Sequence, residues 1–186
     1  MKRLFDLIIA IFLVIIFIPI FFYISLRIKI SSKGPIIYWS KRVGKNNILF
    51  NMPKFRSMHI DTPQVATHLL NNPEIYSSKI GKFIRKTSLD EIPQIFSIIK
   101  GDMSFVGPRP ALWNQEDLIE GRTLKRIHTL TPGITGWAQV NGRDELSIEE
   151  KVNYDFEYLM KKSFRFDLLI IWLTFKNVIR KDGISH

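Results

Sequence analysis

The stretch 7–24 reads LIIAIFLVIIFIPIFFYI, eighteen consecutive residues without a charge. A straight helix of this length, at about 1.5 Å per residue, reaches roughly 27 Å, close to the hydrocarbon thickness of a bilayer. Apolar side chains occupy nearly every position around such a helix, so burial inside a soluble protein is the weaker interpretation. A signal peptide is also disfavoured, because the run is too long and no A-x-A-like site follows it. The sequence therefore predicts an N-terminal helix in the membrane.

Basic residues lie on both sides of this apolar run. Lys2 and Arg3 precede it, and five more basic residues follow it: Arg27, Lys29, Lys33, Lys41 and Arg42. Because Lys and Arg favour the cytoplasmic side, a helix that enters the membrane and returns on the same side fits better than a simple span, which stays the alternative. Pro19 supplies the break in this helix, because it removes a backbone donor and clashes with the carbonyl of Ile15.

The rest of the chain mixes short strands with helices. Two β-prone stretches flank a Gly-Lys-Asn-Asn turn within 36–50, which predicts a hairpin. A polar loop is expected over 60–78, and helices over 88–100 (closed by Gly101), 113–129, 148–161 and 163–180. The last helix carries apolar and basic residues together, so it either lies in the membrane interface or packs on the core.

The charge of the chain indicates anionic partners. Lys and Arg number 27 against 17 Asp and Glu, a formal net charge of +10, which suits nucleic acid, acidic lipids or phosphorylated substrates. The 14 Phe crowd partly into hydrophobic stretches, and no helix-turn-helix or RNP-like string occurs, so no nucleic-acid partner is expected. The chain has no Cys, which excludes disulfides and thiolate zinc sites, and its four His show no metal-ligand spacing.

Two adjacent acids stand in the segment 88–94, SLDEIPQ. A capping box between Ser88 and Glu91 is one interpretation. Pro93 disfavours it, because proline is harmless only in the first turn, so the helix should begin at Asp90 or just after it. Asp90 then lies at a helix N-terminus, where free N–H groups and the dipole lower its pKa. Such a carboxylate can be a nucleophile or a metal ligand, and a purely structural helix start stays the alternative.

Arginines, glycines and prolines gather in two further segments, 107–110 (GPRP) and 132–143 (PGITGWAQVNGR). Glycines allow a ligand to approach the backbone closely, and arginine binds phosphate oxygens bidentately. Lys54 and Arg56 add two cations. Each piece alone fits a turn with a solvated charge, whereas together they predict a site for an anion with several phosphate oxygens. The missing P-loop, Rossmann and D-x-D patterns disfavour those nucleotide sites.

As whole strings, these segments resemble the bacterial sugar transferase family, the monotopic polyprenyl-phosphate phosphoglycosyl transferases. The resemblance covers essentially the whole chain and rests on KFRSM at 54–58, RKTSLDEIPQ at 85–94, KGDMSFVGPRP at 100–110 and the segment 132–143. It implies an α+β, mostly helical monotopic membrane protein, with a re-entrant membrane helix over 1–30 and a catalytic domain over 31–186 that carries interfacial amphipathic helices. The implied location is the cytoplasmic face of the bacterial inner membrane.

The resemblance also implies a reaction, the transfer of a sugar-1-phosphate from a UDP-sugar to polyprenyl (undecaprenyl) phosphate, as the first membrane step of glycoconjugate biosynthesis. By that analogy Asp90 attacks the β-phosphate, UMP leaves, and polyprenyl phosphate then takes the phospho-sugar from the enzyme. Glu91 is expected to help place Mg²⁺ or deprotonate the incoming phosphate, so both acids are candidate catalytic residues and metal ligands. The expected phosphate-binding residues are Arg109, Arg143, Lys54 and Arg56.

One departure from the family concerns the membrane helix. Many relatives have Ser-Pro at its break, whereas Ile18 precedes Pro19 here, so a shallower bend is expected. The sequence does not identify the sugar that is transferred. The small size of the chain favours an N-acetylated or bacillosamine-type sugar over galactose or glucose. Partners implied are the UDP-sugar, polyprenyl phosphate and membrane lipid, and a homodimer is compatible with the sequence. A non-catalytic membrane scaffold or a nucleic-acid-binding membrane protein would leave the phosphate-type segments without a role.

Overall fold

The computed structural model describes residues 2–59, 62, 76–142 and 145–180, so the predicted loop over 60–78 lies mostly outside the described residues. The elements are α1 (Lys2–Ser31), β1 (Ile37–Val43), η1 (Lys45–Asn47), β2 (Leu49–Phe55), α2 (Lys79–Lys86), η3 (Leu89–Glu91), α3 (Gln94–Lys100), β3 (Ser104–Val106), α4 (Glu116–Leu124), η4 (Ile127–Thr129), β4 (Gly133–Thr135), α5 (Trp137–Val140), α6 (Ile148–Lys161) and α7 (Phe164–Arg180), where η denotes a 3₁₀ helix.

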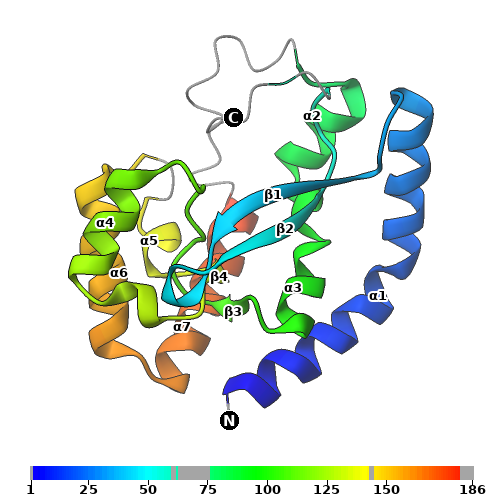
Figure 1. Cartoon of the computed structure of the whole chain (residues 1–186). Coiled ribbons are helices and arrows are strands. Elements are labelled where there is room, and N and C mark those ends of the chain that lie inside the picture. Colours follow the sequence, from blue (N-terminus) through cyan, green and yellow to red (C-terminus); the bar gives the residue numbers. More distant parts are fainter. Residues whose placement is uncertain (1, 60–61, 63–75, 143–144, 181–186) are drawn as a thin grey trace.

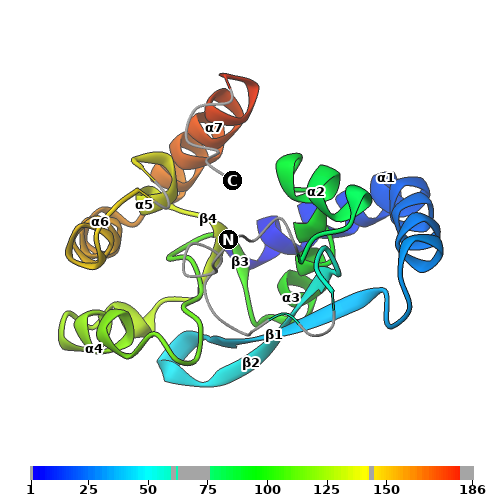
Figure 2. The ribbon, with the colours of Figure 1, turned by 90° about the horizontal axis from the view of Figure 1, so that it is seen from above.

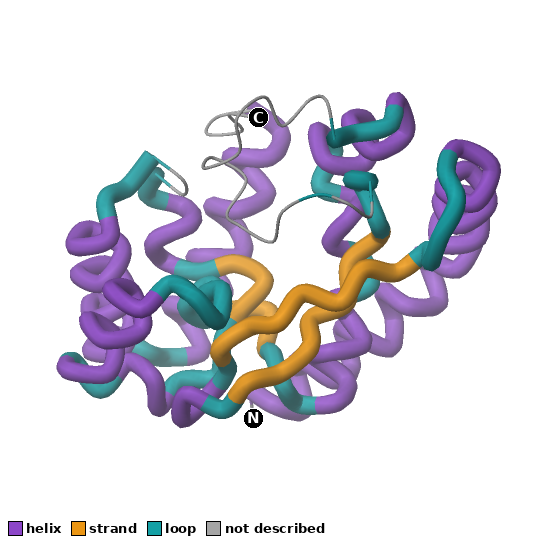
Figure 3. The backbone as a smooth tube through the Cα atoms, turned by 45° about the horizontal axis from the view of Figure 1, so that its top comes forward, coloured by secondary structure: helices purple, strands orange, loops and turns teal. Residues whose placement is uncertain are grey.

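The hairpin of β1 and β2 lies between two groups of helices (Figures 1 and 2). Helices α1 to α3 lie on one side of it, and α4 to α7 lie on the other. A second small sheet pairs β3 with β4 in parallel, and Figure 3 shows both pairs of strands with helices to either side of them. The prediction of a mostly helical fold with small sheets is confirmed.

Helix α1 is one continuous helix of 30 residues with Pro19 inside it. It bends between its two arms (Figure 1), as expected where proline removes a backbone hydrogen bond. The predicted break is therefore a bend within a helix. Within the described residues, α1 is the one helix long and apolar enough to cross a membrane, and only 11% of its apolar window is buried. That exposure disfavours a soluble core helix.

Both ends of α1 pack on the same body. At its start, Lys2 Nζ lies 2.6 Å from Asp167 Oδ2 of α7 and donates to the Val106 carbonyl, while Arg3 donates to carbonyls at the end of α3. At its end, Ile24 and Ile28 are buried against side chains of β2 and α2. The two ends are thus held by neighbouring parts of one structure.

The remaining helices differ in how well they follow the predictions. Helix α6 has the predicted bounds, and the hairpin has the predicted turn. The helix predicted over 113–129 is wrong in its extent, because α4 ends at Leu124 and the positive φ of Arg126 separates it from η4. Helix α7 buries Ile170 in the core and exposes Leu168, Trp172, Phe175 and other apolar side chains. It therefore packs on the core and still presents an apolar face.

The glycines of 107–110 and 132–143 serve backbone packing. A Cβ on Gly133 would lie 2.1 Å from the Gly107 nitrogen, and one on Gly136 would lie 2.2 Å from the Gly107 carbonyl oxygen. Only glycine allows these backbones to approach so closely. The expectation that these glycines admit a ligand is therefore corrected for Gly107, Gly133 and Gly136: they bring β4 and the following turn against β3 and the Gly-Pro-Arg-Pro turn.

Candidate active site

The carboxylate pair lies in a 3₁₀ turn ahead of a helix. Ser88 has a positive φ of 55°, and its side chain makes no capping hydrogen bond, so the capping-box interpretation is wrong. Asp90 and Glu91 occupy η3, and the α-helix α3 begins at Gln94 directly after Pro93. The proline moves the helix start past both acids, as expected from its missing N–H. Both carboxylates consequently precede the helix, close to its first turn.

Glu91 is held by two cations. Its Oε1 accepts from Lys54 Nζ at 2.8 Å and from Arg109 Nη2 at 2.6 Å. Although burial raises the pKa of Glu91, the charges of Arg109 and Lys54 and their hydrogen bonds together hold that pKa well below its ordinary value. Glu91 is therefore ionised, and it links a cation of β2 to the arginine of the Gly-Pro-Arg-Pro turn.

Asp90 lies in a different environment from that of Glu91. Its side chain is buried, and Lys54 Nζ comes no nearer than 4.0 Å to its Oδ2. Burial and the neighbouring charge of Glu91 raise the pKa of Asp90, and the cations Lys54, Arg109 and Arg85 offset this in part. The prediction of a lowered pKa is therefore wrong, because α3 begins four residues later and burial outweighs any helix dipole. Of the two carboxyls, Asp90 is therefore the one whose ionised form has the weaker stabilisation.

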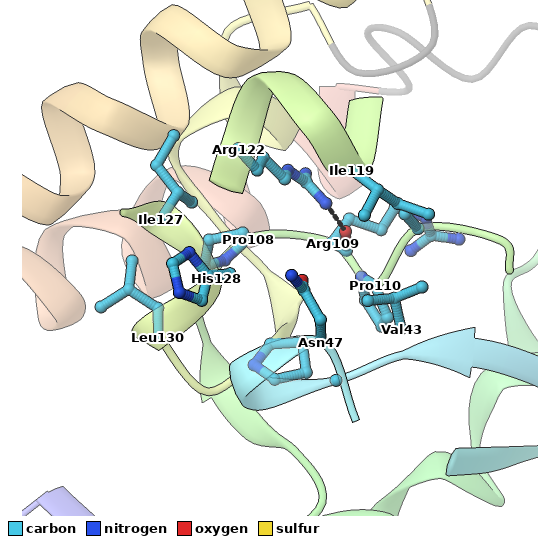
Figure 4. Close-up of a pocket in the computed structure, with 13 residues that line it drawn as sticks. Val43, Asn47, Pro108, Arg109, Pro110, Ile119, Arg122, Ile127, His128 and Leu130 are labelled. Carbon is cyan, nitrogen blue, oxygen red and sulfur yellow. Dashed lines mark hydrogen bonds between the residues drawn. The ribbon is translucent and has the colours of Figure 1, made fainter. Parts of the chain in front are cut away.

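The backbone at Arg109 is held by a hydrogen bond from α4. Arg122 of α4 donates from Nη1 to the Arg109 carbonyl at 2.8 Å, and its Nη2 lies 2.6 Å from Asp155 Oδ2 of α6. Figure 4 shows Arg122 reaching that carbonyl beside a small pocket, while the Arg109 side chain extends away from it. The buried pair of Arg122 and Asp155 thus supports the turn that presents Arg109 to Glu91. Sequence reasoning missed this pair, because Arg122 and Asp155 stand in no motif with each other.

Of the predicted phosphate-binding residues, the structure places Arg56 away from the cluster and does not describe Arg143. Arg56 is buried, and its guanidinium donates to the carbonyls of Ser32 and Lys33, just beyond α1, and to Ser32 Oγ. Its donors are therefore occupied by the residues that follow α1. Arg143 lies outside the described residues. The structure brings together Asp90, Glu91, Lys54 and Arg109, and it places Arg56 elsewhere.

A further cation, Arg42 of β1, was missed by sequence reasoning as a site residue. Its Nη1 donates to the carbonyl of Pro110, next to Arg109, and Nε donates to Ser40 Oγ. The pairing of Tyr38 with Lys54 places Arg42 and Lys54 on one face of the hairpin, because side chains alternate along a strand. That alternation, read together with the predicted hairpin, is the signal that could have found Arg42.

The two acids also fit a divalent cation that takes only one or two ligands from the protein. Among the residues that the structure describes, no group of three or more His, Cys, Asp and Glu comes together. Mg²⁺ usually binds through one or two carboxylates, with substrate phosphates and water completing its shell. Asp90 accepts no hydrogen bond within the described part of the chain, so its oxygens can serve such an ion. The donor set therefore suits Mg²⁺ carried by a phosphorylated substrate.

Comparison with known proteins shows a matching family and several similar proteins. The profile described as bacterial sugar transferase matches residues 1–181. "Uncharacterized sugar transferase EpsL" of Bacillus subtilis (strain 168) is 41% identical over all of this chain and 91% of its own length. The "UDP-glucose:undecaprenyl-phosphate glucose-1-phosphate transferase" of Escherichia coli (strain K12) is 40% identical over 97% of this chain and 41% of its own length.

A third relative is the "UDP-N-acetylgalactosamine-undecaprenyl-phosphate N-acetylgalactosaminephosphotransferase" of Aeromonas hydrophila, 34% identical over 98% of this chain and 44% of its own length. The chain thus spans less than half the length of the two relatives that are named for a reaction, and nearly all of the uncharacterized one.

Proposed function

Because the chain belongs to the bacterial sugar transferase family, we propose that it transfers a sugar-1-phosphate from a UDP-sugar to polyprenyl phosphate and releases UMP. The names of two relatives give this class of donor and acceptor for those proteins. The observation that carries the proposal for this chain is the asymmetry of the carboxylate pair. Glu91 accepts hydrogen bonds from both Lys54 and Arg109, whereas Asp90 accepts none from the described residues.

Asp90 is the proposed nucleophile. An oxygen of its carboxylate forms a bond to the β-phosphorus of the UDP-sugar, the bond from that phosphorus to the bridging oxygen breaks, and UMP leaves with that oxygen. An oxygen of polyprenyl phosphate then attacks the same phosphorus, and the bond to Asp90 breaks, which restores the carboxylate. The lipid product is a polyprenyl-diphosphate sugar. Two displacements at one phosphorus need a nucleophile that can also leave, which a carboxylate satisfies.

Glu91 has a positioning role in this proposal. It stays ionised between Lys54 and Arg109, and so it holds two cations beside Asp90. Carboxylate attack on a diphosphate brings anions together, so these cations lower the repulsion that opposes the attack. Arg109 is fixed at its carbonyl by Arg122, which limits how far its charge can move.

Mg²⁺ is part of the proposal. When bound, the ion supplies charge that offsets the diphosphate oxygens, and Asp90 and Glu91 are the residues that would hold it. Asp90 suits this role because it accepts no hydrogen bond from the described residues and its Oδ2 lies 4.0 Å from Lys54 Nζ, whereas Glu91 Oε1 is already engaged by Lys54 and Arg109. Removal of Mg²⁺ with EDTA is expected to abolish UMP release and to leave the fold intact.

We further propose that α1 is re-entrant and that residues 31–186 form the catalytic domain on the cytoplasmic face of the inner membrane. Support comes from Lys2 and Ile28, at opposite ends of α1, which both contact the one body that carries the carboxylate pair. A spanning helix would separate those ends by a bilayer. The exposed apolar face of α7 suits an interfacial helix.

The sugar is proposed from the sequence alone, as an N-acetylated amino sugar. The test is a panel of UDP-sugars, offered with polyprenyl phosphate and Mg²⁺ to the purified chain in detergent. We expect one UDP-sugar to give equal amounts of UMP and lipid-linked sugar. Absence of both products with every UDP-sugar would contradict the proposed reaction, and UMP without lipid product would contradict the proposed acceptor. Sedimentation of the same sample tests the homodimer, which is compatible with the sequence.

A further inference from the structure

One face of the β1–β2 hairpin carries Arg42 of β1 and Lys54 of β2, and Lys54 contacts the carboxylate pair. Paired residues of an antiparallel hairpin share a face, and Tyr38 pairs with Lys54, Ser40 with Met52, and Arg42 with Phe50. Arg42 therefore lies on the same face as Lys54, which contacts Glu91. The strand geometry alone therefore places Arg42 and Lys54 on one face of the hairpin.

The same arginine is joined to the turn that carries Arg109. Arg42 Nη1 donates to the Pro110 carbonyl at 3.1 Å, Arg42 bridges to Leu112, and the next residue donates from its backbone to the Ala111 carbonyl. Its Nε donates to the hydroxyl of buried Ser40 at 2.9 Å. Within the described part of the chain, Nη2 has no hydrogen-bond partner. Two nitrogens thus fix the guanidinium, and the third can bind a ligand.

Arg42 and Arg109 stand close enough for their charges to repel. Burial and the charge of Arg109 lower the pKa of Arg42 to about 10, while Glu91 raises it. Lys54 adds a third positive charge, and the described carboxylates are Glu91, already shared by two cations, and Asp90, whose pKa is raised. Partly buried like charges are costly to hold together unless an anion completes the site. The cluster therefore has an excess of positive charge in the absence of substrate.

We propose that Arg42 is a substrate-binding residue that contacts the diphosphate of a nucleoside-diphosphate sugar together with Arg109. This inference rests on the proposed function and extends it by one residue and one contact. The guanidinium is suited to the task, because two fixed nitrogens orient the plane and arginine matches phosphate oxygens in a forked geometry. A purely structural role, in which Arg42 only joins the hairpin to Pro110, predicts loss of stability without a specific loss of phosphate binding.

The test is calorimetric binding of UDP, in the presence of Mg²⁺, to the full chain in detergent. Arg42→Gln is expected to weaken UDP binding about 10-fold or more, as for the loss of a charge-assisted hydrogen bond, and also to lower the thermal midpoint, because it removes the donors to Pro110 and Ser40. The matched control is Lys41→Gln, which removes the same charge from the neighbouring exposed residue, whose ammonium lies over Trp113. Lys41→Gln is expected to bind UDP as tightly as the unmodified chain.

Equal UDP affinity of Arg42→Gln and the unmodified chain would overturn the inference, as would equal weakening by Lys41→Gln. If Arg42→Gln does not fold, Arg42→Lys decides: we expect it to fold and to bind UDP several-fold more weakly, and unchanged affinity would overturn the inference. Failure of the proposed function is seen separately, because the unmodified chain would then neither bind UDP nor release UMP.

Discussion

Asp90 and Glu91 are neighbours in the chain, yet their surroundings shift their pKa values in opposite directions and suit them to different tasks. Glu91 receives two cations within 2.8 Å, whereas the nearest described ammonium stands 4.0 Å from Asp90. Two buried carboxylates side by side cannot both ionise at ordinary pH without compensation, so the one with the better partners ionises first. The division leaves the oxygens of Asp90 available for attack, and the positive charges of Lys54, Arg109 and a bound Mg²⁺ would offset the charge of the substrate diphosphate.

Asp90→Asn is expected to lower UMP release by about 10³-fold or more, because an amide oxygen cannot form and break the phosphorus bond. The same change should keep or raise the thermal midpoint at pH 7, since it removes a buried carboxylate. Asp102→Asn is the control, because Asp102 pairs with exposed Lys100. Asp90→Asn with unchanged activity would contradict the assignment.

The raised pKa of Asp90 predicts an acid limb in the pH profile. As pH falls through that pKa, Asp90 gains a proton and kcat/KM for the UDP-sugar declines, at a pH above that expected for an ordinary Asp, 3.8. Glu91→Gln removes a like charge and releases Lys54, so it should move this limb to lower pH in the residual activity. The profile is measured by initial rates of UMP release, and a limb that moves to higher pH would contradict this electrostatic account.

The raised pKa of Asp90 also makes the stability of the fold depend on pH. The direction is opposite to that of a salt-bridged carboxylate, whose lowered pKa stabilises the fold as pH rises. A folded-state pKa above the unfolded value means that the ionised group disfavours folding, and the penalty grows as pH rises through the window between the two values. Asp90→Asn should therefore stabilise the chain above that window, and the gain should vanish below about pH 3.8.

At the scale of elements, basic side chains hold helix ends by donating to their last carbonyls. Arg3 donates to Ile98 and Ile99 at the end of α3, and Arg56 donates to Ser32 and Lys33 just beyond α1. Helix C-termini leave carbonyls unpaired, and cations there also meet the negative end of the dipole. Helix α1 is thereby joined to the rest of the structure near both ends by arginines.

Arg56→Met is expected to destabilise the fold by about 1.5–3 kcal/mol, because it leaves carbonyls near the end of α1 without their charged donor. UDP affinity should stay within about twofold, since the Arg56 donors face those carbonyls. Thermal melts and UDP calorimetry on one preparation check both statements, with exposed Lys29→Met as the control near the same helix end. A tenfold loss of UDP affinity with an unchanged melt would instead assign Arg56 to phosphate binding.

The sequence predicted the helices and strands whose turn, cap or periodicity signals are strong. It did not predict the properties that depend on burial and tertiary contacts. The hairpin, α6 and the Gly101 end of α3 follow from turn, cap and periodicity signals. The pKa of Asp90 could not be predicted, because it depends on how closely β2 and the Gly-Pro-Arg-Pro turn enclose the acid. The link from Asp155 through Arg122 to the Arg109 carbonyl was equally invisible, since tertiary packing alone joins those residues.

At the scale of the whole molecule, one long apolar helix and a basic body form a single unit. Most of α1 is exposed and apolar, whereas its start is hydrogen-bonded to α3 and α7 and its end packs on β2 and α2. A bilayer that covers the exposed face of α1 would also meet the apolar face of α7. The active-site cluster would then lie near the membrane surface, where a lipid phosphate can reach it.

The topology has a direct test, because the chain contains no cysteine. One cysteine is added before Met1, and another replaces exposed Lys33, just beyond α1, in separate variants. A re-entrant α1 predicts that both react with a membrane-impermeant maleimide from the cytoplasmic side of inverted vesicles. Reaction from opposite sides would establish a spanning helix instead.

The central claim, that Asp90 carries the phospho-sugar, is tested most directly by mass spectrometry of the quenched enzyme. The chain is mixed with its UDP-sugar and Mg²⁺ without polyprenyl phosphate, denatured within seconds, and digested for peptide mapping. We predict a mass increase of one sugar phosphate on the peptide that contains Asp90, lost when polyprenyl phosphate is added before the quench and absent from Asp90→Asn. An active enzyme that shows no adduct, or an adduct on another residue, would contradict the account.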